Sequence, residues 1–132
     1  MKQRFLLRPP VKGASLPFGQ QIELILNGEV VGTARWHAAD ADDGIFQIAD
    51  LAIAPQHQRQ GHGSALLKKC YAEAYELFAA LNIKPRRAWL LVEQKRHVNA
   101  RAFLSKHGFQ HVSTMTALMR GQDGMLYQRS FD

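Results

Sequence analysis

A transition from an apolar strand to a helix, through a loop with two glycines, constrains the fold of this chain more than any other feature. The segment "IFQIADLAIAP" predicts a strand over residues 45–55 whose apolar end is buried on both faces. Apolar residues then recur at helical spacing over residues 63–83, and "AWLLVEQ" predicts a buried strand over residues 88–94. A strand, a helix and a second strand in this order predict a right-handed crossover between parallel strands.

The flanking segments predict antiparallel strands. A short strand over residues 1–8 is stopped by Pro9 and Pro10, and residues 9–20 have the composition of a loop. The segment "QIELILNGEVVGTARW" predicts a hairpin with a two-residue turn at Asn27-Gly28. The segment "VNARAFLSKHGF", residues 98–109, predicts a second helix that ends at Gly108.

The last two expected strands, residues 111–119 and 125–131, are joined by the turn "RGQDG". The whole pattern predicts an α/β fold with a mixed sheet and a central parallel strand–helix–strand unit. At 132 residues, the chain has the size of one domain, which we expect to span residues 1–132.

Composition narrows the class of protein. Hydrophobic residues make up 46% of the chain, yet no run of about 18 apolar residues exists, so we expect no membrane span. The apolar stretch near the N-terminus is too short for a secretory signal, which favours a cytoplasmic location. Cys70 is the single cysteine and falls on the apolar side of the first helix, so we expect it to be a core residue without a disulfide.

The formal charge of +6 favours an anionic partner, either a nucleic acid, an acidic surface or a phosphate-bearing cofactor. The lysines and arginines are scattered over the two expected helices and a loop, which is not the clustered pattern of a nucleic-acid interface. Nucleic-acid binding is therefore the least supported of these partners.

The glycine loop has two interpretations. It is either a plain turn between strand and helix, or an anion site formed by the unpaired amides at the helix N-terminus. Glycines at Gly61 and Gly63 allow an anion to approach the backbone closely, and Arg59 adds a positive charge. The sequence matches neither a Walker A loop nor the dinucleotide-binding fingerprint.

Two segments together decide between these interpretations. "DLAIAPQHQRQGHGSALL" and the later "NARAFLSKHGF" resemble the GNAT (Gcn5-related N-acetyltransferase) superfamily. In that family an apolar strand ends in a proline and is followed by a Gln/Arg-x-x-Gly-x-Gly/Ala loop and a helix, here Gln58 to Gly63. The second helix of the family ends in a Lys-x-Gly-Phe-like signature, matched by Lys106 to Phe109. The resemblance covers residues 22–131.

The resemblance implies an acetyl-CoA-dependent N-acetyltransferase, with acetyl-CoA as co-substrate. The amide near Ile53 would stabilise the oxyanion when an amine attacks the thioester directly. The pantetheine arm would pair with the preceding strand, and Asn99 would steady it because His97 stands at the family's usual asparagine position. The implied acetyl-CoA-binding residues are Leu51, Ala52, Ile53, Gln58, Arg59, Gln60, Gly61, His62, Gly63, Ser64 and Asn99. No metal ligands are assigned.

The catalytic groups depart from the family pattern. Asp50 is the nearest candidate base, and Glu93 and His37 are further candidates; some family members instead use a glutamate where this chain has Gln47. Leu104 stands at the usual position of a tyrosine acid, so the CoA thiolate would be protonated by water or by another group. This departure leaves open an alternative, an acyl-CoA-binding module with little or no catalysis.

The N-terminal region is shortened relative to the family, because residues 9–21 replace one or two helices that help to wall the acceptor site. We expect one of two arrangements. The acceptor site is open and suits a large acceptor such as a protein amine, or a second subunit in a homodimer completes it. The acidic turn of residues 40–43 is either a solvated loop or a segment that attracts a cationic acceptor. The sequence does not distinguish a small-molecule amine from a protein amine as acceptor.

Overall fold

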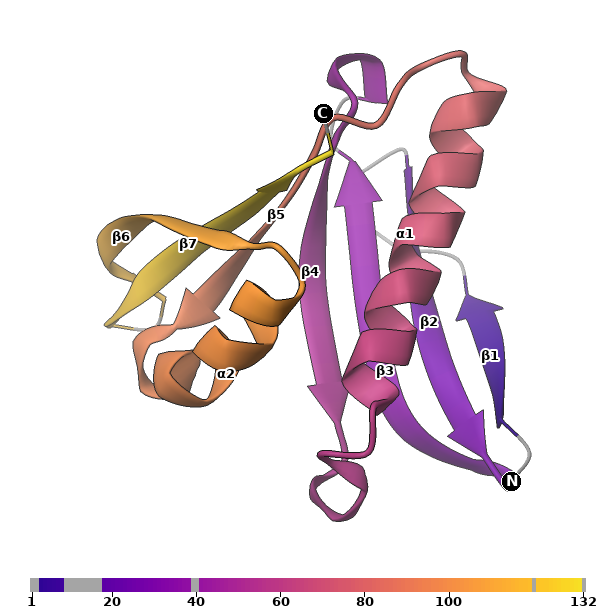
Figure 1. Ribbon diagram of the computed structural model, residues 1–132, viewed down its shortest axis with the longest axis horizontal. Helices are drawn as coiled ribbons and strands as arrows, with labels where there is room; N and C mark the ends of the chain where they lie inside the picture. Colours follow the sequence, from indigo (N-terminus) through magenta and orange to yellow (C-terminus); the bar gives the residue numbers. More distant parts are fainter. Residues whose placement is uncertain (1–2, 9–17, 39–40, 120, 132) are drawn as a thin grey trace. The chain divides into compact units, whose positions relative to one another are not determined.

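The structure is a computed structural model that describes residues 3–8, 18–38, 41–119 and 121–131. The chain forms two compact units, Met1–Pro85 and Arg86–Asp132, whose elements are drawn in Figure 1. Among the described residues, the order of strands and α-helices is the one that the sequence predicts. The single domain over residues 1–132 stays a prediction.

The first unit is an antiparallel sheet with one α-helix. Its strands, β1 to β4, follow one another in the sheet as they do in the chain. They are β1 (Gln3–Arg8), β2 (Phe18–Leu26), β3 (Glu29–Ala38) and β4 (Ile45–Ile53), followed by α1 (His62–Ala80); two short 3₁₀ turns, η1 (Ala41–Asp43) and η2 (Pro55–His57), flank β4.

The hairpin between β2 and β3 is confirmed, with positive φ angles at Asn27 (53°) and Gly28 (84°) as a primed turn requires. The expected loop over residues 9–20 is too long. β2 already begins at Phe18, where it pairs with Ala38 of β3. Backbone pairing with β3 overrides the glycine and proline content that suggested a loop; residues 9–17 lie outside the described residues.

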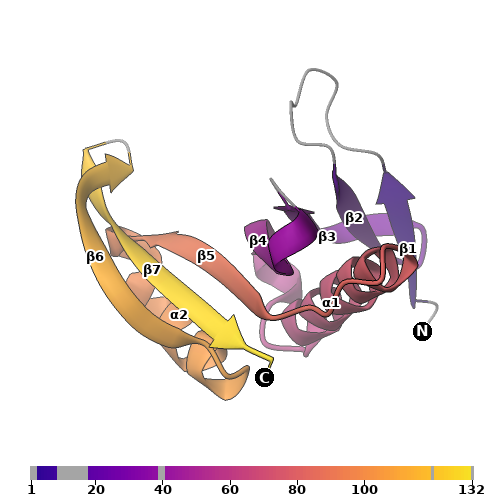
Figure 2. The ribbon, with the colours of Figure 1, turned by 90° about the horizontal axis from the view of Figure 1, so that it is seen from above.

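Helix α1 packs along one face of this sheet, as Figure 2 shows. Phe46 of β4 contacts Trp36 of β3 and Phe78 of α1, with ring centroids 6.1 and 6.0 Å apart. Ile53 and Leu66 meet over Gly32, where an added Cβ would lie 2.6 and 2.9 Å from their Cδ1 atoms. A glycine at position 32 therefore lets α1 approach the end of β4 closely.

A β-bulge in β4 decides which residues face α1. Arg35 pairs with Asp50 and Trp36 pairs with Ile48, so that Ala49 is the extra residue. Without the bulge, strict alternation would place Asp50 on the same face as Phe46 and Ile48. The bulge reverses the alternation: Leu51 and Ile53 join the apolar face, and Asp50 turns to the opposite face.

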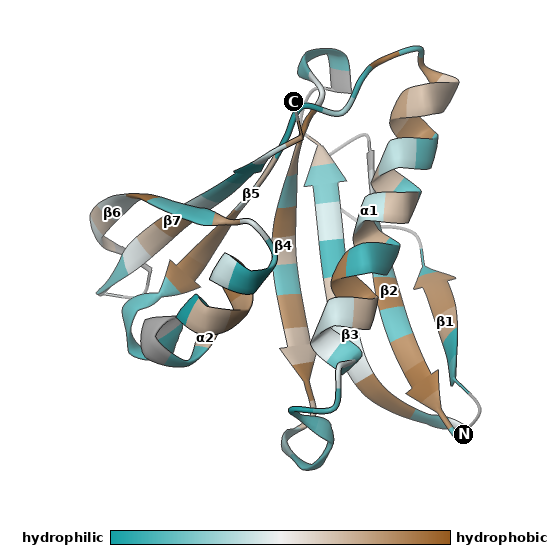
Figure 3. Ribbon diagram, in the orientation of Figure 1, coloured by the Kyte–Doolittle hydropathy of each residue, from teal (hydrophilic) through white to brown (hydrophobic). Residues whose placement is uncertain are grey.

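The expected burial of β4 on both faces is wrong for its last residues. Leu51 and Ile53 are half-buried and Ala52 is exposed, although Figure 3 shows that the strand stays hydrophobic to its end, before a hydrophilic loop. The reason is the bulge, which places Ala52 on the face that α1 does not cover.

The second unit contains β5 (Arg87–Glu93), α2 (Gln94–Lys106), β6 (Gln110–Met119) and β7 (Gln122–Ser130), with β7 between β5 and β6. Helix α2 begins four residues before the expected start, directly after β5. The turn predicted at "RGQDG" is shorter than expected, because β7 begins at Gln122. Asp123 Oδ1 accepts a hydrogen bond from the Ala117 amide (3.0 Å), which closes the hairpin across an irregular stretch of β6.

The "KHGF" motif has a structural role at the end of α2. Gly108 has a φ of 82°, as expected of the residue that ends a helix, and the Phe109 amide donates to the Leu104 carbonyl (2.9 Å). Phe109 is buried. Part of the motif that pointed to the family therefore stops a helix and anchors it in the core.

Candidate active site

The loop from Gln58 to Gly61 has an unusual backbone conformation. Arg59 and Gly61 both have positive φ angles, 63° and 83°. Turns that contain left-handed residues bring backbone amides together into concavities that suit an anion. The space around Gly61 is open, since a Cβ added there would meet no atom within 4 Å. Its positive φ, rather than crowding, therefore requires glycine at this position.

Helix α1 presents free backbone donors at the same place. It begins at His62, one residue earlier than expected, with Gly61 as its N-cap and no side-chain cap. The Ala65 amide makes the first intrahelical bond, to the Gly61 carbonyl (3.1 Å). The amides of His62 and Gly63 precede that bond and form part of the positive end of the helix dipole.

His62 is a buried polar residue at this helix start, with 8% of the residue's surface exposed. Its Nε2 atom has no hydrogen-bond partner among the described residues, and its ring lies 6.2 Å from that of His57. A buried polar atom without a partner is uncommon and indicates a group that a ligand or water satisfies. The sequence assigned only the backbone of His62 to the site.

The last residues of β4 direct one amide away from β3. The Ala54 amide donates to the Val31 carbonyl of β3 (2.9 Å). Because successive amides of a strand point to opposite sides, the Ile53 amide points away from β3. The candidate oxyanion donor thus lies on the side of β4 that faces away from β3.

The side chain of Gln58 contacts the same residue. Its Nε2 donates to the Ile53 carbonyl at 3.1 Å. The carbonyl and amide of one strand residue point to the same side, so Gln58 satisfies one of the two backbone groups of Ile53 and leaves the amide available. The sequence assigned Gln58 only a backbone role; its side-chain role depends on a turn that the sequence does not reveal.

The remaining predicted site residues fall into three groups. Arg59 and Gln60 are exposed in the loop, and Ser64 is half-buried in the first turn of α1. Leu51 and Ala52 precede Ile53 on β4. Asn99 is exposed on α2 of the second unit, and its contact with the pantetheine arm stays a prediction.

The three candidate bases differ in their surroundings. Asp50 is exposed on the face of the sheet opposite α1, directly across from Arg35. Glu93 is half-buried at the junction of β5 and α2 in the second unit. His37 is half-buried on β3, beside Gln47 of β4.

His37 and Gln47 form a hydrogen bond of 2.8 Å between Nε2 and Oε1. With the amide oxygen assigned to that position, Nε2 carries the proton and Nδ1 is the lone-pair nitrogen. Nδ1 is buried and has no hydrogen-bond partner among the described residues. Burial and, second, the charge of Arg35 lower the pKa of His37, so the neutral ring is favoured.

Two residues outside this chemistry are core residues. Leu104 is 3% exposed, so the usual tyrosine position serves packing in this chain. Cys70 is fully buried, as expected, and burial raises the pKa of its thiol to about 12. A thiol with that pKa is not a nucleophile near neutral pH.

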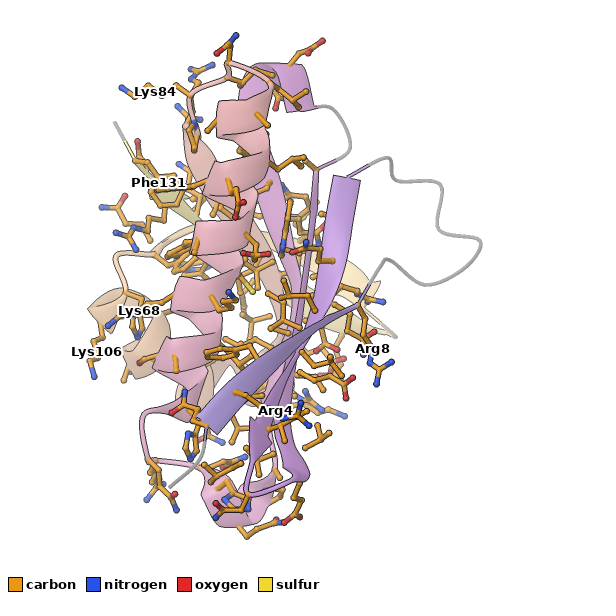
Figure 4. The ribbon with its side chains drawn as sticks, turned by 90° about the vertical axis from the view of Figure 1, so that its right-hand side faces the viewer. Arg4, Arg8, Lys68, Lys84, Lys106 and Phe131 are labelled. Carbon is orange, nitrogen blue, oxygen red and sulfur yellow. The ribbon has the colours of Figure 1, made fainter. Side chains whose placement is uncertain are left out.

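The basic residues of the first unit do not form one stripe. Figure 4 shows Arg4 and Arg8 along β1, Lys68 on α1 and Lys84 beyond the end of that helix. Arg8 is paired with Glu23 on β2.

In the described part of the chain, no helix is long and apolar enough to span a membrane.

The amino-acid sequence matches the profile of a known protein family. A profile described as "Acetyltransferase (GNAT) domain" matches residues 21–111. The chain therefore belongs to the GNAT acetyltransferase family. No curated protein matches the sequence.

Solved structures show the same fold. A GNAT family acetyltransferase from Elizabethkingia anophelis with acetyl-CoA bound superposes with a TM-score of 0.75 at 16% identity, over 98% of this chain and 100% of that one. The IAA acetyltransferase of Bacillus cereus gives 0.74 at 15% identity over the same shares. The ribosomal-protein-S18-alanine N-acetyltransferase of Escherichia coli gives 0.70 at 21% identity, over 88% of this chain and 71% of that one. The predicted mixed α/β fold is confirmed.

Proposed function

We propose that this protein transfers the acetyl group of acetyl-CoA to a primary amine by direct attack in a ternary complex. The observation that carries the proposal is the joint geometry of the strand end and the loop. The Ile53 amide points away from β3, and α1 begins nine residues later at His62, with no side-chain cap. The two features suit the two ends of one extended ligand.

The residues present fit acetyl-CoA. Its pyrophosphate suits the amides of the loop and of the first turn of α1, with Arg59 as a countercharge. Its pantetheine arm suits the backbone groups of Leu51 and Ile53 that face away from β3, in the manner of an added strand. Acetyl-CoA supplies the activated acetyl group as a thioester; the protein supplies position and hydrogen bonds.

The transfer needs few protein groups. The acceptor loses a proton from its ammonium, and its nitrogen then forms a bond to the thioester carbonyl carbon. The Ile53 amide stabilises the negative charge that develops on the carbonyl oxygen. The carbon–sulfur bond breaks, and the CoA thiolate leaves and takes up a proton.

Asp50 is the proposed first acceptor of the ammonium proton, since its carboxylate is exposed on the same strand as Ile53. No acid is assigned, because Leu104 cannot donate a proton. Holding both substrates against one amide accounts for much of the expected acceleration.

A second candidate function is an acyl-CoA-binding module with little or no catalysis. The buried Leu104 favours this function. A protein that only binds acyl-CoA does not have to protonate a leaving thiolate, so it does not need the family's tyrosine. A cytoplasmic location and a homodimer also stay predictions.

Two measurements on the full chain test these functions. Calorimetry measures the affinity for CoA, and release of CoA thiol is followed while acetyl-CoA is offered with amino acids, polyamines, aminoglycosides and peptides. Turnover of one amine class supports the transferase. Saturable CoA binding without turnover of any amine supports the binding module, and a protein that binds no CoA contradicts both.

A further inference from the structure

A small hollow lies on the face of the first unit that α1 does not cover. It has a volume of about 60 Å³ and is lined by residues of three neighbouring strands: Gln21, Thr33, Ala34, Arg35 and Asp50. Arg35 stands opposite Gln21 of β2 and opposite Asp50 of β4. Directly opposed residues point to the same face, so these three side chains form one row across the sheet.

The hollow contains two opposite charges that are not joined to each other. Ion pairs within 4 Å connect Arg8 with Glu23 and Lys69 with Glu73 in the described part of the chain, and neither pair includes Arg35 or Asp50. Oppositely charged residues in direct register usually attract each other. Here both are exposed and the hollow lies between them, so each charge is available to a ligand.

The hollow borders the strand segment that carries the proposed thioester site. Asp50 directly precedes Leu51, and Thr33 stands opposite Ala52. An amine held in the hollow therefore lies beside the part of β4 that ends with the Ile53 amide. The bulge at Ala49 creates this arrangement, because it moves Asp50 from the face of α1 to the face of Arg35.

We infer that the acceptor is a small zwitterion, an α-amino acid whose ammonium binds Asp50 and whose carboxylate binds Arg35. This inference rests on the proposed acetyl transfer. A guanidinium matches a carboxylate in geometry as well as in charge, and Gln21 and Thr33 add uncharged hydrogen-bonding groups. A polyamine, by contrast, brings further positive charge toward Arg35.

The volume sets a second condition on the acceptor. A water molecule takes up about 30 Å³ in the liquid, so the hollow has room for the ammonium and carboxylate of one amino acid. The amino-acid side chain extends into solvent. The enzyme should therefore select for the charged head group and tolerate different side chains.

Matched acceptors test the inference on the full chain. Acetyl transfer is measured with phenylalanine and with phenethylamine, which lacks only the carboxylate, and with spermidine. We expect phenylalanine to have the highest kcat/KM. Arg35→Gln should lower kcat/KM for phenylalanine by about 10- to 100-fold, the range for a lost hydrogen bond to a charged group, and leave phenethylamine almost unchanged.

Arg8→Gln is the matched control, because Arg8 is a neighbouring arginine that does not line the hollow and is paired with Glu23. It should leave the preference for phenylalanine intact, and thermal melting should show both variants folded. A wild-type protein that acetylates phenethylamine or spermidine as well as phenylalanine overturns the inference while leaving the transferase in place.

A different result separates the two proposals. If no amine is acetylated, the proposed function fails, and binding of phenylalanine is measured directly by NMR titration. The zwitterion site is supported, independently of acetyl transfer, if phenylalanine binds saturably to wild type and to Arg8→Gln but not to Arg35→Gln. Absence of saturable binding overturns it.

Discussion

A single charge placed in the first turn of α1 tests the acetyl-CoA site most directly. Gly63 is the second residue of the helix, and its amide precedes the first intrahelical hydrogen bond. We expect Gly63→Asp to weaken CoA binding at physiological salt, because its carboxylate would stand beside the proposed pyrophosphate position. Gly63→Asn is the matched control, since it adds a side chain of nearly the same size without the charge.

The expected magnitude follows from the distance between the charges. Two like charges about 4 Å apart repel by about 1 kcal/mol in water and about 4 kcal/mol at an effective dielectric constant of about 20. Half-buried Gly63 lies between these limits. The CoA dissociation constant of the aspartate variant should therefore exceed that of the asparagine variant by about 5- to 1000-fold.

Folding should not confound the comparison. A carboxylate in the first turn of a helix is stabilising by about 0.3–1 kcal/mol, and aspartate has a higher helix propensity than glycine. The aspartate variant should melt no lower than wild type. Calorimetric titration with CoA at two salt concentrations gives the affinities, and the ratio between the variants should shrink as salt screens the repulsion.

CoA affinities of folded Gly63→Asp and Gly63→Asn that both equal the wild-type affinity would refute the pyrophosphate site. A loss of affinity in both variants to the same degree would show that the side chain, rather than its charge, obstructs the ligand. Only a difference between the variants supports an anion at this helix start.

Three further predictions concern stability and reactivity. Gly32→Ala should lower the free energy of unfolding by about 1–3 kcal/mol, measured by urea denaturation, because its Cβ would overlap the ends of Ile53 and Leu66; an unchanged midpoint would contradict this packing. The Cys70 thiol, with a pKa of about 12, should react with a thiol reagent at pH 8 only after denaturant is added, whereas rapid reaction of the folded protein would show that it is accessible. Burial lowers the pKa of His37 in the folded protein, so as pH falls below about 6.5 this histidine takes up a proton more readily in the unfolded chain than in the folded one. Stability should therefore decline with acid in that window, and His37→Gln should flatten the decline in urea titrations; identical profiles for both proteins would refute this.

The order of elements could be predicted from the sequence because it depends on local signals. Asn27-Gly28 specifies a primed turn and Gly108 a helix end, since both need positive φ angles that few residues adopt. Periodicity identified the two helices, but the start of α2 and the start of β2 were placed too late. Boundaries shift because pairing partners, such as Ala38 for Phe18, are distant in the chain.

The sequence by itself determined the fold class, the family and the loop that is proposed to hold CoA, because these depend on residues close together in the chain. Only the tertiary structure decided which face of β4 each residue occupies. The bulge at Ala49 is a mismatch between two strands, so no local pattern records it. It moves Asp50 away from the core to a position opposite Arg35. The pairing of β3 with β4 also places Gln47 beside His37, and the turn after β4 brings Gln58 back to Ile53. Strand pairing and the turn after β4 thus give the proposed site the side-chain positions that its loop motif does not specify.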